Sequence, residues 1–442
     1  MSATRGRIAG WGLALLFLAN AGVVVALWLG GGGLQDIHDS ASFLVGLGRI
    51  SGLLGAYLVL VELLLLARLP LLERLLGFER LTRWHAWNGR VCLTLLVTHA
   101  VLVTWGYTIG DRISLPSEIG RLWNGYPGVI TATAGLVILI GVVVTSVVAV
   151  RRRLRYETWY FVHLYAYLGV ALAFSHQLAT GTDFVGDPAA RAYWTALYIA
   201  TLGALVIFRL GVPLVRSAWH DLRVARVLEE GPTVTSIEIE GRRLGSLKAR
   251  AGQFFTWRFL TRDRWWEAHP FSLSAAPDGR RLRITVKGLG DYTSALRAIP
   301  PGTRVIAEGP FGGFTAAARR RPRVALIAGG VGITPIRALL EDMPGGPEDI
   351  TVVYRAQRDD DVILRAELDE LAGRRGIRVH YVVGAHDAAE PLSPERLREL
   401  MPDIASRDVY VCGPPAMVEA TRATLGRSGV SRRHIVTERF AY

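Results

Sequence analysis

The first half of the chain consists of long apolar runs separated by short polar stretches. Examples are GLALLFLANAGVVVALWLG near the start and GVITATAGLVILIGVVVTSVVAV shortly before the middle. A run of about 20 apolar residues is long enough to cross the hydrocarbon core of a bilayer as a helix. The pattern therefore predicts a six-helix transmembrane bundle. Its spans are expected at residues 8–29, 44–66, 85–107, 128–150, 157–180 and 192–215.

The second half has shorter runs in which apolar and polar positions alternate. RLRITVK places Leu282 and Ile284 on one face, which is the period of a half-buried strand. TVTSIEIEG and GQFFTWRFL are also strand-like and lie between Gly and Pro turns, which predicts an antiparallel β-barrel. Further on, strand-like runs such as RVALIAGG alternate with helical ones such as TPIRALLEDM, which predicts an α/β domain with a parallel sheet. The expected domains are a membrane domain over 1–216, a barrel domain over 217–320 and an α/β domain over 321–442.

Composition agrees with a membrane protein and argues against two other classes. Half of the residues are hydrophobic, and the mean hydropathy is +0.28. The net charge of +13 comes almost entirely from arginine, since only Lys248 and Lys287 are lysines. This charge is not gathered into a basic recognition patch, so no nucleic-acid partner is expected. Two cysteines, Cys92 and Cys412, are too few for a four-thiolate iron–sulfur cluster and lie in different halves, so no disulfide is expected.

The loops between the apolar runs differ in charge, and the difference predicts orientation. Arginines gather before the first span and in two alternate loops, whereas the other loops are poorer in arginine and carry acids. By the positive-inside rule, both termini and the whole second half face the cytoplasm. We therefore expect a multi-pass protein of the plasma membrane. The arginines that carry this prediction are Arg5, Arg7, Arg68, Arg74, Arg80, Arg83, Arg151, Arg152, Arg153 and Arg155.

Two of the predicted spans carry histidine pairs at similar spacing. His85 and His99 are fourteen residues apart in the third span, and His163 and His176 are thirteen apart in the fifth. Each pair is separated by about 20 Å along its helix, and both helices enter from the cytoplasm. His85 and His163 are therefore expected near the inner face, and the other two further out. Imidazole suits iron, so the two helices are predicted to clamp two haem irons, each from both sides.

Details of these spans lead to three further expectations. Thirteen residues fall short of four helical turns, so a bulge or local unwinding is predicted between His163 and His176. Arg90 follows Gly89, which would let a flat macrocycle approach the backbone, and Arg90 and Arg49 are candidate partners of haem propionates. The alternatives are a hydrogen bond to a neighbouring helix for any single histidine and snorkelling toward head groups for the arginines.

Three motifs in the second half place glycines where a strand gives way to a helix. VKGLGDYTSAL has Thr293 at the start of a predicted helix, where backbone N–H groups bind anions. AGGVGITP ends a strand and opens a helix, with Thr334 suited to the N-cap and Pro335 to the first helical position. Its glycines would let a pyrophosphate approach the backbone. YVCGPPAM ends another strand at the carboxyl edge, where ligands bind in open α/β sheets.

The ordered set GQFF, HPFSLSAAP, GDYTSAL, GPFGG, AGGVGITP, YVCGPP and a terminal ERF resembles the ferredoxin–NADP reductase-type flavin module. Joined to six spans with paired histidines, it is similar to the NADPH oxidase and ferric reductase family, in particular its bacterial members. The resemblance covers nearly the whole chain from residue 44. It implies two stacked b-type haems, with His85 paired to His163 and His99 to His176. It also implies FAD on the barrel and a nicotinamide nucleotide on the last domain.

The resemblance further implies roles for individual residues in the second half. An aromatic side chain near the C-terminus covers the flavin ring in the family; Phe440 matches by its ERF context, and Tyr442 follows two residues later. Phe440 and Cys412 are expected at the reacting centre. The implied FAD residues are His269, Pro270, Phe271, Ser272, Lys287, Gly290 and Thr293, and the implied nucleotide residues are Gly330, Gly332, Thr334, Arg358, Cys412 and Gly413.

The segment VVYRAQRDDD bears on the choice between NADPH and NADH. A 2′-phosphate calls for arginine near the end of the second strand of the nucleotide domain, and Arg355 and Arg358 stand there. The three aspartates that follow would instead repel a phosphate or bind ribose hydroxyls. We expect NADPH, on the strength of Arg358, with NADH as the alternative donor.

The expected function is transfer of electrons from cytosolic NAD(P)H through FAD and two haems to a small extracytoplasmic acceptor, with O2 giving superoxide. Reduction of a ferric chelate would use the same path, and a quinone or a methionine-sulfoxide-repair partner system is another possibility. A transporter with a regulatory nucleotide-binding domain would explain the spans but not the four histidines. The sequence gives no sign of an obligatory protein partner.

Overall fold

The computed structural model of the chain describes residues 3–147, 153–154, 156–180, 187–384 and 392–440. Arg151, Arg152, Arg155 and Tyr442, which figure in the expectations above, lie outside the described residues. The chain divides into two units, Met1–Gly211 and Val212–Tyr442, which are described in turn.

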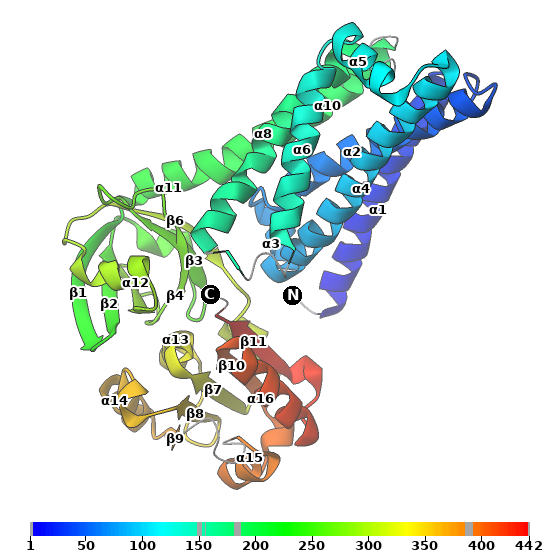
Figure 1. Ribbon diagram of the computed structural model, residues 1–442. Coiled ribbons are helices and arrows are strands. Elements are labelled where there is room, and N and C mark those ends of the chain that lie inside the picture. Colours follow the sequence, from blue (N-terminus) through cyan, green and yellow to red (C-terminus); the bar gives the residue numbers. More distant parts are fainter. Residues whose placement is uncertain (1–2, 148–152, 155, 181–186, 385–391, 441–442) are drawn as a thin grey trace. The chain divides into compact units, whose positions relative to one another are not determined.

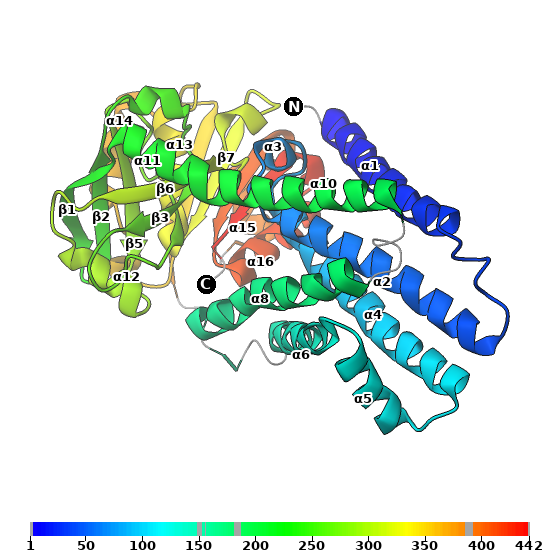
Figure 2. The same cartoon turned by 90° about the horizontal axis from the view of Figure 1, so that it is seen from above.

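Long helices make up the first unit (Figure 1). Their bounds are α1 Ala3–Gly30, α2 Ser40–Leu65, α3 Pro70–Leu76, α4 Phe78–Asp111, α5 Leu115–Gly125, α6 Val129–Ser146, α8 Tyr156–Thr180, α10 Pro188–Leu205 and the π-helical segment η1 Val206–Gly211. α4 and α8 carry the histidine pairs; α2 packs along α4, and α6 packs along α8, as Figure 2 shows from above. The short helices α3 and α5 lie in loops where no element was predicted.

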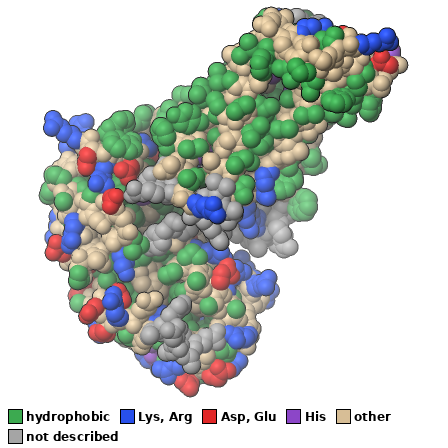
Figure 3. All heavy atoms as spheres, in the orientation of Figure 1, with side chains coloured by type: hydrophobic (Ala, Val, Ile, Leu, Met, Phe, Trp, Pro, Cys, Tyr) green, Lys and Arg blue, Asp and Glu red, His purple; other side chains and the backbone are tan. Residues whose placement is uncertain are grey.

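Five stretches of the described helices are long and apolar enough to cross a membrane. They match five of the six predicted spans closely. α8 has 25 residues but is not among the five, because its histidines, Gln177 and several tyrosines lower its hydropathy. Hydrophobic side chains cover the visible face of the helical unit (Figure 3), and Trp11 is 75% exposed. A surface of this kind is unfavourable in water and suits lipid. The five stretches are Gly10–Gly30, Ser40–Leu65, Arg80–Asp111, Val129–Ser146 and Pro188–His220.

Glycines allow the helices to approach each other closely. A Cβ added to Gly52 of α2 would lie 2.6 Å from Nδ1 of His99 on α4. A Cβ added to Gly135 of α6 would lie 2.5 Å from the carbonyl oxygen of Gly169 on α8. Small residues at helix crossings are a common basis for packing in membranes. They set both histidine-bearing helices directly against their neighbours.

The predicted bulge between His163 and His176 is wrong, because α8 is α-helical from Tyr156 to Thr180. On a regular helix these histidines point about 140° apart. Both rings nevertheless reach partners on α4, so the side chains absorb the mismatch and the backbone does not. A π-helical segment does occur, but in the last span, at η1.

The second unit begins with two three-stranded antiparallel sheets, of strand orders β1-β2-β5 and β4-β3-β6. The strands predicted from alternation are present as β2, β3 and β5. Their apolar positions share one core, in which Ile237, Phe255, Trp257 and Ile284 are fully buried. The bounds are α11 Val212–His220, β1 Arg223–Gly231, β2 Val234–Glu240, β3 Phe254–Phe259, β4 His269–Ser272, β5 Arg281–Lys287, α12 Asp291–Ala295 and β6 Val305–Phe311.

A five-stranded parallel sheet of order β11-β10-β7-β8-β9 follows. Alternate residues of β7 face opposite sides: Leu326 packs with α13 and α14, and Ile327 packs with α15 and α16. Helices therefore cover both faces of the sheet. The bounds are β7 Val324–Gly329, α13 Ile333–Asp342, β8 Ile350–Ala356, α14 Arg365–Arg375, β9 Arg378–Val383, α15 Pro394–Leu400, β10 Asp408–Gly413, α16 Pro415–Arg427 and β11 Ile435–Arg439.

Candidate functional site

The structure brings the four intramembrane histidines together in two pairs. The ring centres of His85 and His163 are 5.9 Å apart, and those of His99 and His176 are 6.2 Å apart. Each pair joins α4 to α8. These are the two pairs predicted from the sequence, in which each histidine of α4 faces the histidine of α8 at the same depth.

In every one of the four rings, Nδ1 contacts another group of the protein. Nδ1 of His99 lies 2.9 Å from the carbonyl oxygen of Gly48, and Nδ1 of His176 lies 2.7 Å from that of Ala173. A carbonyl oxygen can only accept, so both rings carry their proton on Nδ1. Their Nε2 atoms therefore keep the lone pair that a metal needs.

The other two rings follow the same rule with different partners. Nδ1 of His163 lies 3.2 Å from the hydroxyl oxygen of Ser146, and that hydroxyl donates its own proton to the carbonyl of Val142. With that proton committed to Val142, protonation of His163 at Nδ1 is favoured. Nδ1 of His85 lies 2.7 Å from a carboxylate oxygen of Glu62 on α2, close enough for an ion pair although the N–H is not well aligned for a hydrogen bond. Protonation at Nδ1 is favoured there as well.

This arrangement fits a haem iron between each pair. An imidazole nitrogen binds a first-row metal at about 2.0–2.1 Å, so two imidazoles on opposite sides of one metal have ring centres about 6 Å apart. Both observed separations match. In the part of the chain that is described, no group of three or more His, Cys, Asp or Glu side chains could hold a bare metal ion. A haem needs only two axial side chains, because the macrocycle supplies the remaining ligands.

The two arginines proposed for the propionates have protein partners. Arg49 forms an ion pair of 3.2 Å with Asp36, and Arg90 bends back to donate to the carbonyl of Ala86. Gly89 does not open a surface for a macrocycle: a Cβ there would meet the Glu62 carboxylate at 2.8 Å. The expectation that Gly89 lets a macrocycle approach the backbone is therefore wrong, since the missing side chain makes room for Glu62.

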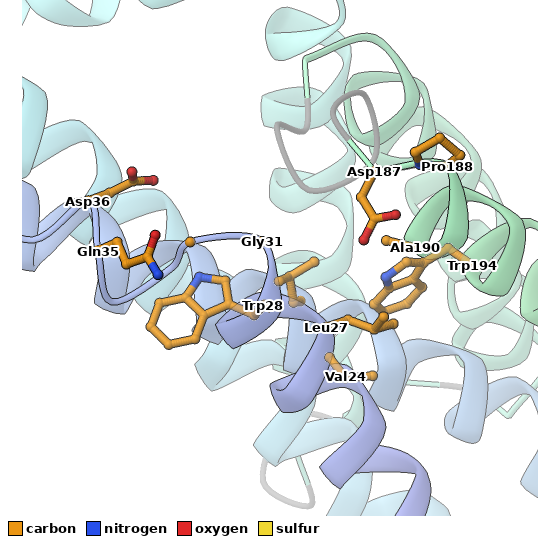
Figure 4. A pocket seen from close by; sticks show the side chains of 13 residues that line it. Val24, Leu27, Trp28, Gly31, Gln35, Asp36, Asp187, Pro188, Ala190 and Trp194 are labelled. Carbon is orange, nitrogen blue, oxygen red and sulfur yellow. The ribbon is translucent and has the colours of Figure 1, made fainter.

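A cavity of about 530 Å³ lies between α1, α2 and the start of α10 (Figure 4). Asp36, Asp187 and the indoles of Trp28 and Trp194 are among its lining residues. None of the paired histidines lines it.

The residues assigned to FAD lie on β4, at the end of β5 and at the start of α12. His269 of β4 stacks on Tyr292 of α12, with ring centres 4.0 Å apart. The Thr293 hydroxyl accepts the backbone N–H groups of Leu289 and Gly290, so this turn supplies its own cap. Lys287, at the end of β5, places its Nζ 3.7 Å from Asp361 of the nucleotide domain. Pro270, Phe271 and Ser272 complete β4, where Phe271 pairs with Phe255 of β3 and Ser272 is buried.

In the AGGVGITP turn, Gly332 and Gly330 are glycine for two different physical reasons. A Cβ on Gly332 would overlap the carbonyl of Cys412 and come within 2.8 Å of Cα of Gly413. Gly332 is therefore required where the carboxyl ends of β7 and β10 meet. Gly330 has open space around it but a φ of +53°, which favours glycine. Gly330 is the position whose surroundings leave room for a ligand.

The helix after this turn begins earlier than predicted. Gly332 is the N-cap of α13, so Thr334 and Pro335 lie within the first turn and not at the cap and first position. The Thr334 hydroxyl donates to the carbonyl of Val331 and is almost fully buried. Residues 330–332 form a 3₁₀ turn that leads directly from β7 into α13.

Cys412 lies on β10, and Phe440 directly follows the neighbouring strand β11. Cys412 is fully buried in β10, and this burial raises the pKa of its thiol well above the usual value. Both cysteines are free, as expected. Phe440 follows β11, is half-buried, and donates its backbone N–H to the carbonyl of Gly413 at 3.3 Å. The structure thus ties the C-terminal aromatic residue to the end of β10.

Arg355, near the end of β8, and Arg358, just after it, have different surroundings. The guanidinium of Arg355 is buried and donates to the carbonyl oxygens of Ala356 and Gly384. The side chain of Arg358 is 78% exposed and lies 3.2 Å from Asp361, whose pKa it holds below the usual value. Of the two, Arg358 is the one whose side chain is accessible to solvent.

Partly buried ion pairs connect the antiparallel sheets to the nucleotide domain. Glu367 of α14 lies 2.7 Å from Arg283 of β5 and 2.9 Å from Arg337 of α13. Burial alone would raise the pKa of Glu367, but the hydrogen bonds and charges of these arginines hold it below the usual value. Because each partner lies on a different element, the cluster fixes β5 against the nucleotide domain.

Comparison with known proteins matches three family descriptions in chain order. "Ferric reductase like transmembrane component" covers residues 51–174, "FAD-binding domain" covers 224–314, and "Oxidoreductase NAD-binding domain" covers 326–423. His85, His99 and His163 lie within the first match. Residues 51–174 therefore match the ferric reductase-like transmembrane component, and they are fused to a reductase module of the ferredoxin–NADP reductase type.

Individual relatives agree with this assignment. The chain is 26% identical to "Ferric reduction oxidase 7, chloroplastic" of Arabidopsis thaliana, over 75% of the chain and 46% of that protein. It is 30% identical to the "Flavohemoprotein" of Deinococcus radiodurans, over 50% of the chain and 60% of that protein. It is 30% identical to "Ferredoxin--NADP reductase B" of Sorangium cellulosum, over 38% of the chain and 77% of that protein. The ferric reductase-like chain spans about half the length of the first two relatives.

A solved structure is also similar. The flavohaem-like FAD/NAD-binding domain of nitric oxide dioxygenase from Vibrio cholerae covers 50% of this chain at 23% identity, with a TM-score of 0.42.

Sequence reasoning missed three residues that hold the histidines in place. Glu62 contacts His85, Asn88 donates to Glu62, and Ser146 contacts His163. One signal was visible: Glu62 is the lone acid in the apolar run LVLVELLLLA. A carboxylate inside a membrane helix is costly unless it has a partner. The position of Glu62 in the sequence therefore already indicated that a partner side chain lies nearby.

Proposed function

We propose that the chain transfers electrons from cytosolic NAD(P)H through FAD and two b-type haems to an acceptor on the other side of the membrane. The cofactors supply hydride acceptance and one-electron transfer when bound. The chain's own residues bind them, set their spacing and keep water away. The observation that carries the proposal is the common tautomer of the four paired histidines, each with Nδ1 engaged and Nε2 left for a metal.

The proposed topology has six spans. They are the five apolar stretches together with α8, which is the fifth span in chain order. α8 packs along α6 over its length and shares its histidines with α4, which makes membrane insertion of all three consistent. Bound haems would cover polar rings that otherwise face hydrocarbon. Both termini are proposed to face the cytoplasm at the plasma membrane, on the distribution of arginines among the loops.

In the second unit, FAD is proposed on β4 and the turn before α12, and the nucleotide at the ends of β7 and β10. Support comes from the stacking of His269 on Tyr292 and from the open space at Gly330. Phe440 and Cys412 are proposed beside the flavin and the nicotinamide. Arg90 and Arg49 are proposed to exchange their present partners for haem propionates.

The proposed acceptor is O2, reduced to superoxide. Reduction of a ferric chelate is the second candidate, since a relative that matches 75% of this chain is called a ferric reduction oxidase. The test uses the purified protein in detergent or nanodiscs. We expect a Soret band, then NADPH-dependent dye reduction that superoxide dismutase suppresses. Absence of haem absorption after haem supply during expression would contradict the proposal, and dismutase-insensitive ferric reduction would select the second candidate.

Arg358 is expected to select NADPH over NADH. Arg358→Ala should lower kcat/KM for NADPH roughly tenfold to a hundredfold, because a charge-assisted contact to the 2′-phosphate is lost. NADH, which has no such phosphate, should be affected little. Steady-state kinetics with both donors measures the difference. Arg374→Ala is the matched control, since Arg374 is also exposed and paired with an acid, Glu370, in the same domain. Equal losses for both donors in Arg358→Ala would contradict this role.

Phe440 is expected to act as a gate that lowers nucleotide occupancy while it protects the flavin. Its ring would occupy the flavin face that the nicotinamide needs. Phe440→Ser should therefore tighten NAD(P)H binding by about tenfold and strengthen the charge-transfer absorption between nicotinamide and flavin. Titration of the flavin spectrum with NADP+ and NADPH measures both effects. Tyr442→Ser is the comparison, and an effect in that variant alone would assign the gate to Tyr442.

A further inference from the structure

Glu62 is an acid within a membrane helix, and its contacts connect it to one histidine only. One carboxylate oxygen lies 2.7 Å from Nδ1 of His85, and the other accepts a hydrogen bond of 2.7 Å from the amide of Asn88. Asn88 also donates to the carbonyl of Leu58, which fixes the direction of its amide. The absence of a side chain at Gly89 leaves the space that the carboxylate fills. The position of the carboxylate is therefore determined by α4 as well as α2.

The partner of His85 differs from those of the other three histidines. Nδ1 of His99 and of His176 contacts a backbone carbonyl, and Nδ1 of His163 contacts a hydroxyl, all of them neutral groups. Among the described residues, the pair formed by His85 and His163 is therefore the one with an anionic partner at one of its rings. The outer pair of His99 and His176 has two neutral ones.

An anionic partner at Nδ1 changes the chemistry at Nε2 of the same ring. The negative charge 2.7 Å from Nδ1 stabilises positive charge on the ring, so the ring becomes a stronger electron donor to a metal at Nε2. Stronger donation favours the more highly charged, oxidised metal. Hydrogen bonding to axial ligands is one of the main ways in which a protein sets the reduction potential of a haem.

We propose that Glu62 is a positioning residue that makes the inner haem the stronger reductant of the two. This inference rests on the proposed function, since it concerns the haem assigned to His85 and His163. The carboxylate fixes the Nδ1–H tautomer of His85 and lowers the potential of the inner haem relative to the outer one. An electron on the inner haem then moves outward to a site of higher potential. The difference between the ring partners thus gives the path its direction.

The test is potentiometric titration of the purified holoprotein, with each haem assigned by its loss in His85→Ala or His99→Ala. Glu62→Gln keeps an acceptor oxygen but removes the charge. We expect it to raise the midpoint potential of the inner haem by the equivalent of a 10- to 100-fold change in the ratio of oxidised to reduced haem. At 59 mV per tenfold for one electron, this is about 60–120 mV. The outer haem of the same molecule is the internal control and should not shift.

Two further variants separate charge from packing. Glu62→Asp retains the charge and should shift the inner haem much less than Glu62→Gln does. Asn88→Ala removes a donor from the carboxylate, which makes the carboxylate a stronger acceptor, so the inner potential should fall or stay unchanged. Loss of the inner haem in Glu62→Gln but not in Glu62→Asp would also support the role of the charge.

Three results would overturn the inference. They are two haems with unchanged potentials in Glu62→Gln, equal shifts in the Gln and Asp variants, and loss of the inner haem in both. Each of these leaves the haem content of the wild type intact. A wild type without haem would instead remove the proposed function itself, so the two failures are distinguishable.

Discussion

Replacing any one of the four paired histidines by alanine should remove one haem per chain and stop electron transfer across the membrane. His85→Ala and His163→Ala should lose the inner haem, and His99→Ala and His176→Ala the outer one. Each ring is proposed as one of only two axial ligands, and the centre of its partner ring lies about 6 Å away. Haem content per polypeptide should fall to about half. Pyridine haemochrome analysis and the Soret spectrum measure the loss.

A matched control separates the loss of a ligand from the loss of any histidine. His38 is exposed and lies in a loop, so His38→Ala should retain both haems and full activity. NADPH oxidation by the flavin, followed with a soluble dye, should survive in all four ligand variants, because the second unit does not contain these histidines. Two haems with unchanged low-spin spectra in all four variants would show that the assignment is wrong.

Gly332→Ala should abolish nucleotide-dependent reduction and weaken the α/β domain. The added Cβ would overlap the carbonyl of Cys412, which is backbone and cannot rotate away. The turn after β7 must then move away from the end of β10, where the nucleotide is proposed to bind. We expect a loss of about 1–3 kcal/mol in stability, as for other overpacked interiors. Displacement of the site by about 1 Å can reduce kcat/KM about a hundredfold.

Two other glycines serve as controls for this variant. Gly426→Ala adds a Cβ with nothing within 4 Å inside α16 and should stabilise the domain by about 0.5–1 kcal/mol. Gly330→Ala adds one in open space at positive φ and should cost about 1 kcal/mol without a clash. Thermal unfolding and NADPH oxidation are measured in parallel. A Gly332→Ala protein with the stability and activity of the wild type would refute the steric argument.

Much of this molecule could be predicted from the sequence, because its signals are local. The apolar runs require helices long enough for a bilayer, and five of the expected spans coincide with such helices. Leu282 and Ile284 alternate with polar residues because one face of β5 is buried, and that face can be recognised without a structure. The histidine pairing also follows from local information, since depth along a helix is a count of residues.

Other features depend on contacts between segments far apart in the chain. The bulge predicted in α8 is absent because ring direction, which the sequence does not specify, compensates for the thirteen-residue spacing. The sequence predicted that both Gly89 and Gly332 let a ligand come close to the backbone. In the structure, Gly89 makes room for Glu62, and Gly332 makes room for the backbone of Cys412. A missing side chain indicates that something comes close, but only the tertiary structure shows what does.

The sequence by itself determined the class of the protein, the order of its parts and the identity of the four histidines, since each depends on residue type and spacing along one element. Only the tertiary structure decided which group contacts each Nδ1, and therefore which nitrogen is left for a metal. Those partners come from α2, from α6 or from the preceding turn of α8. The physical reason is that a tautomer is set by the nearest acceptor, and for three of the four rings that acceptor lies at least 17 positions away in the chain.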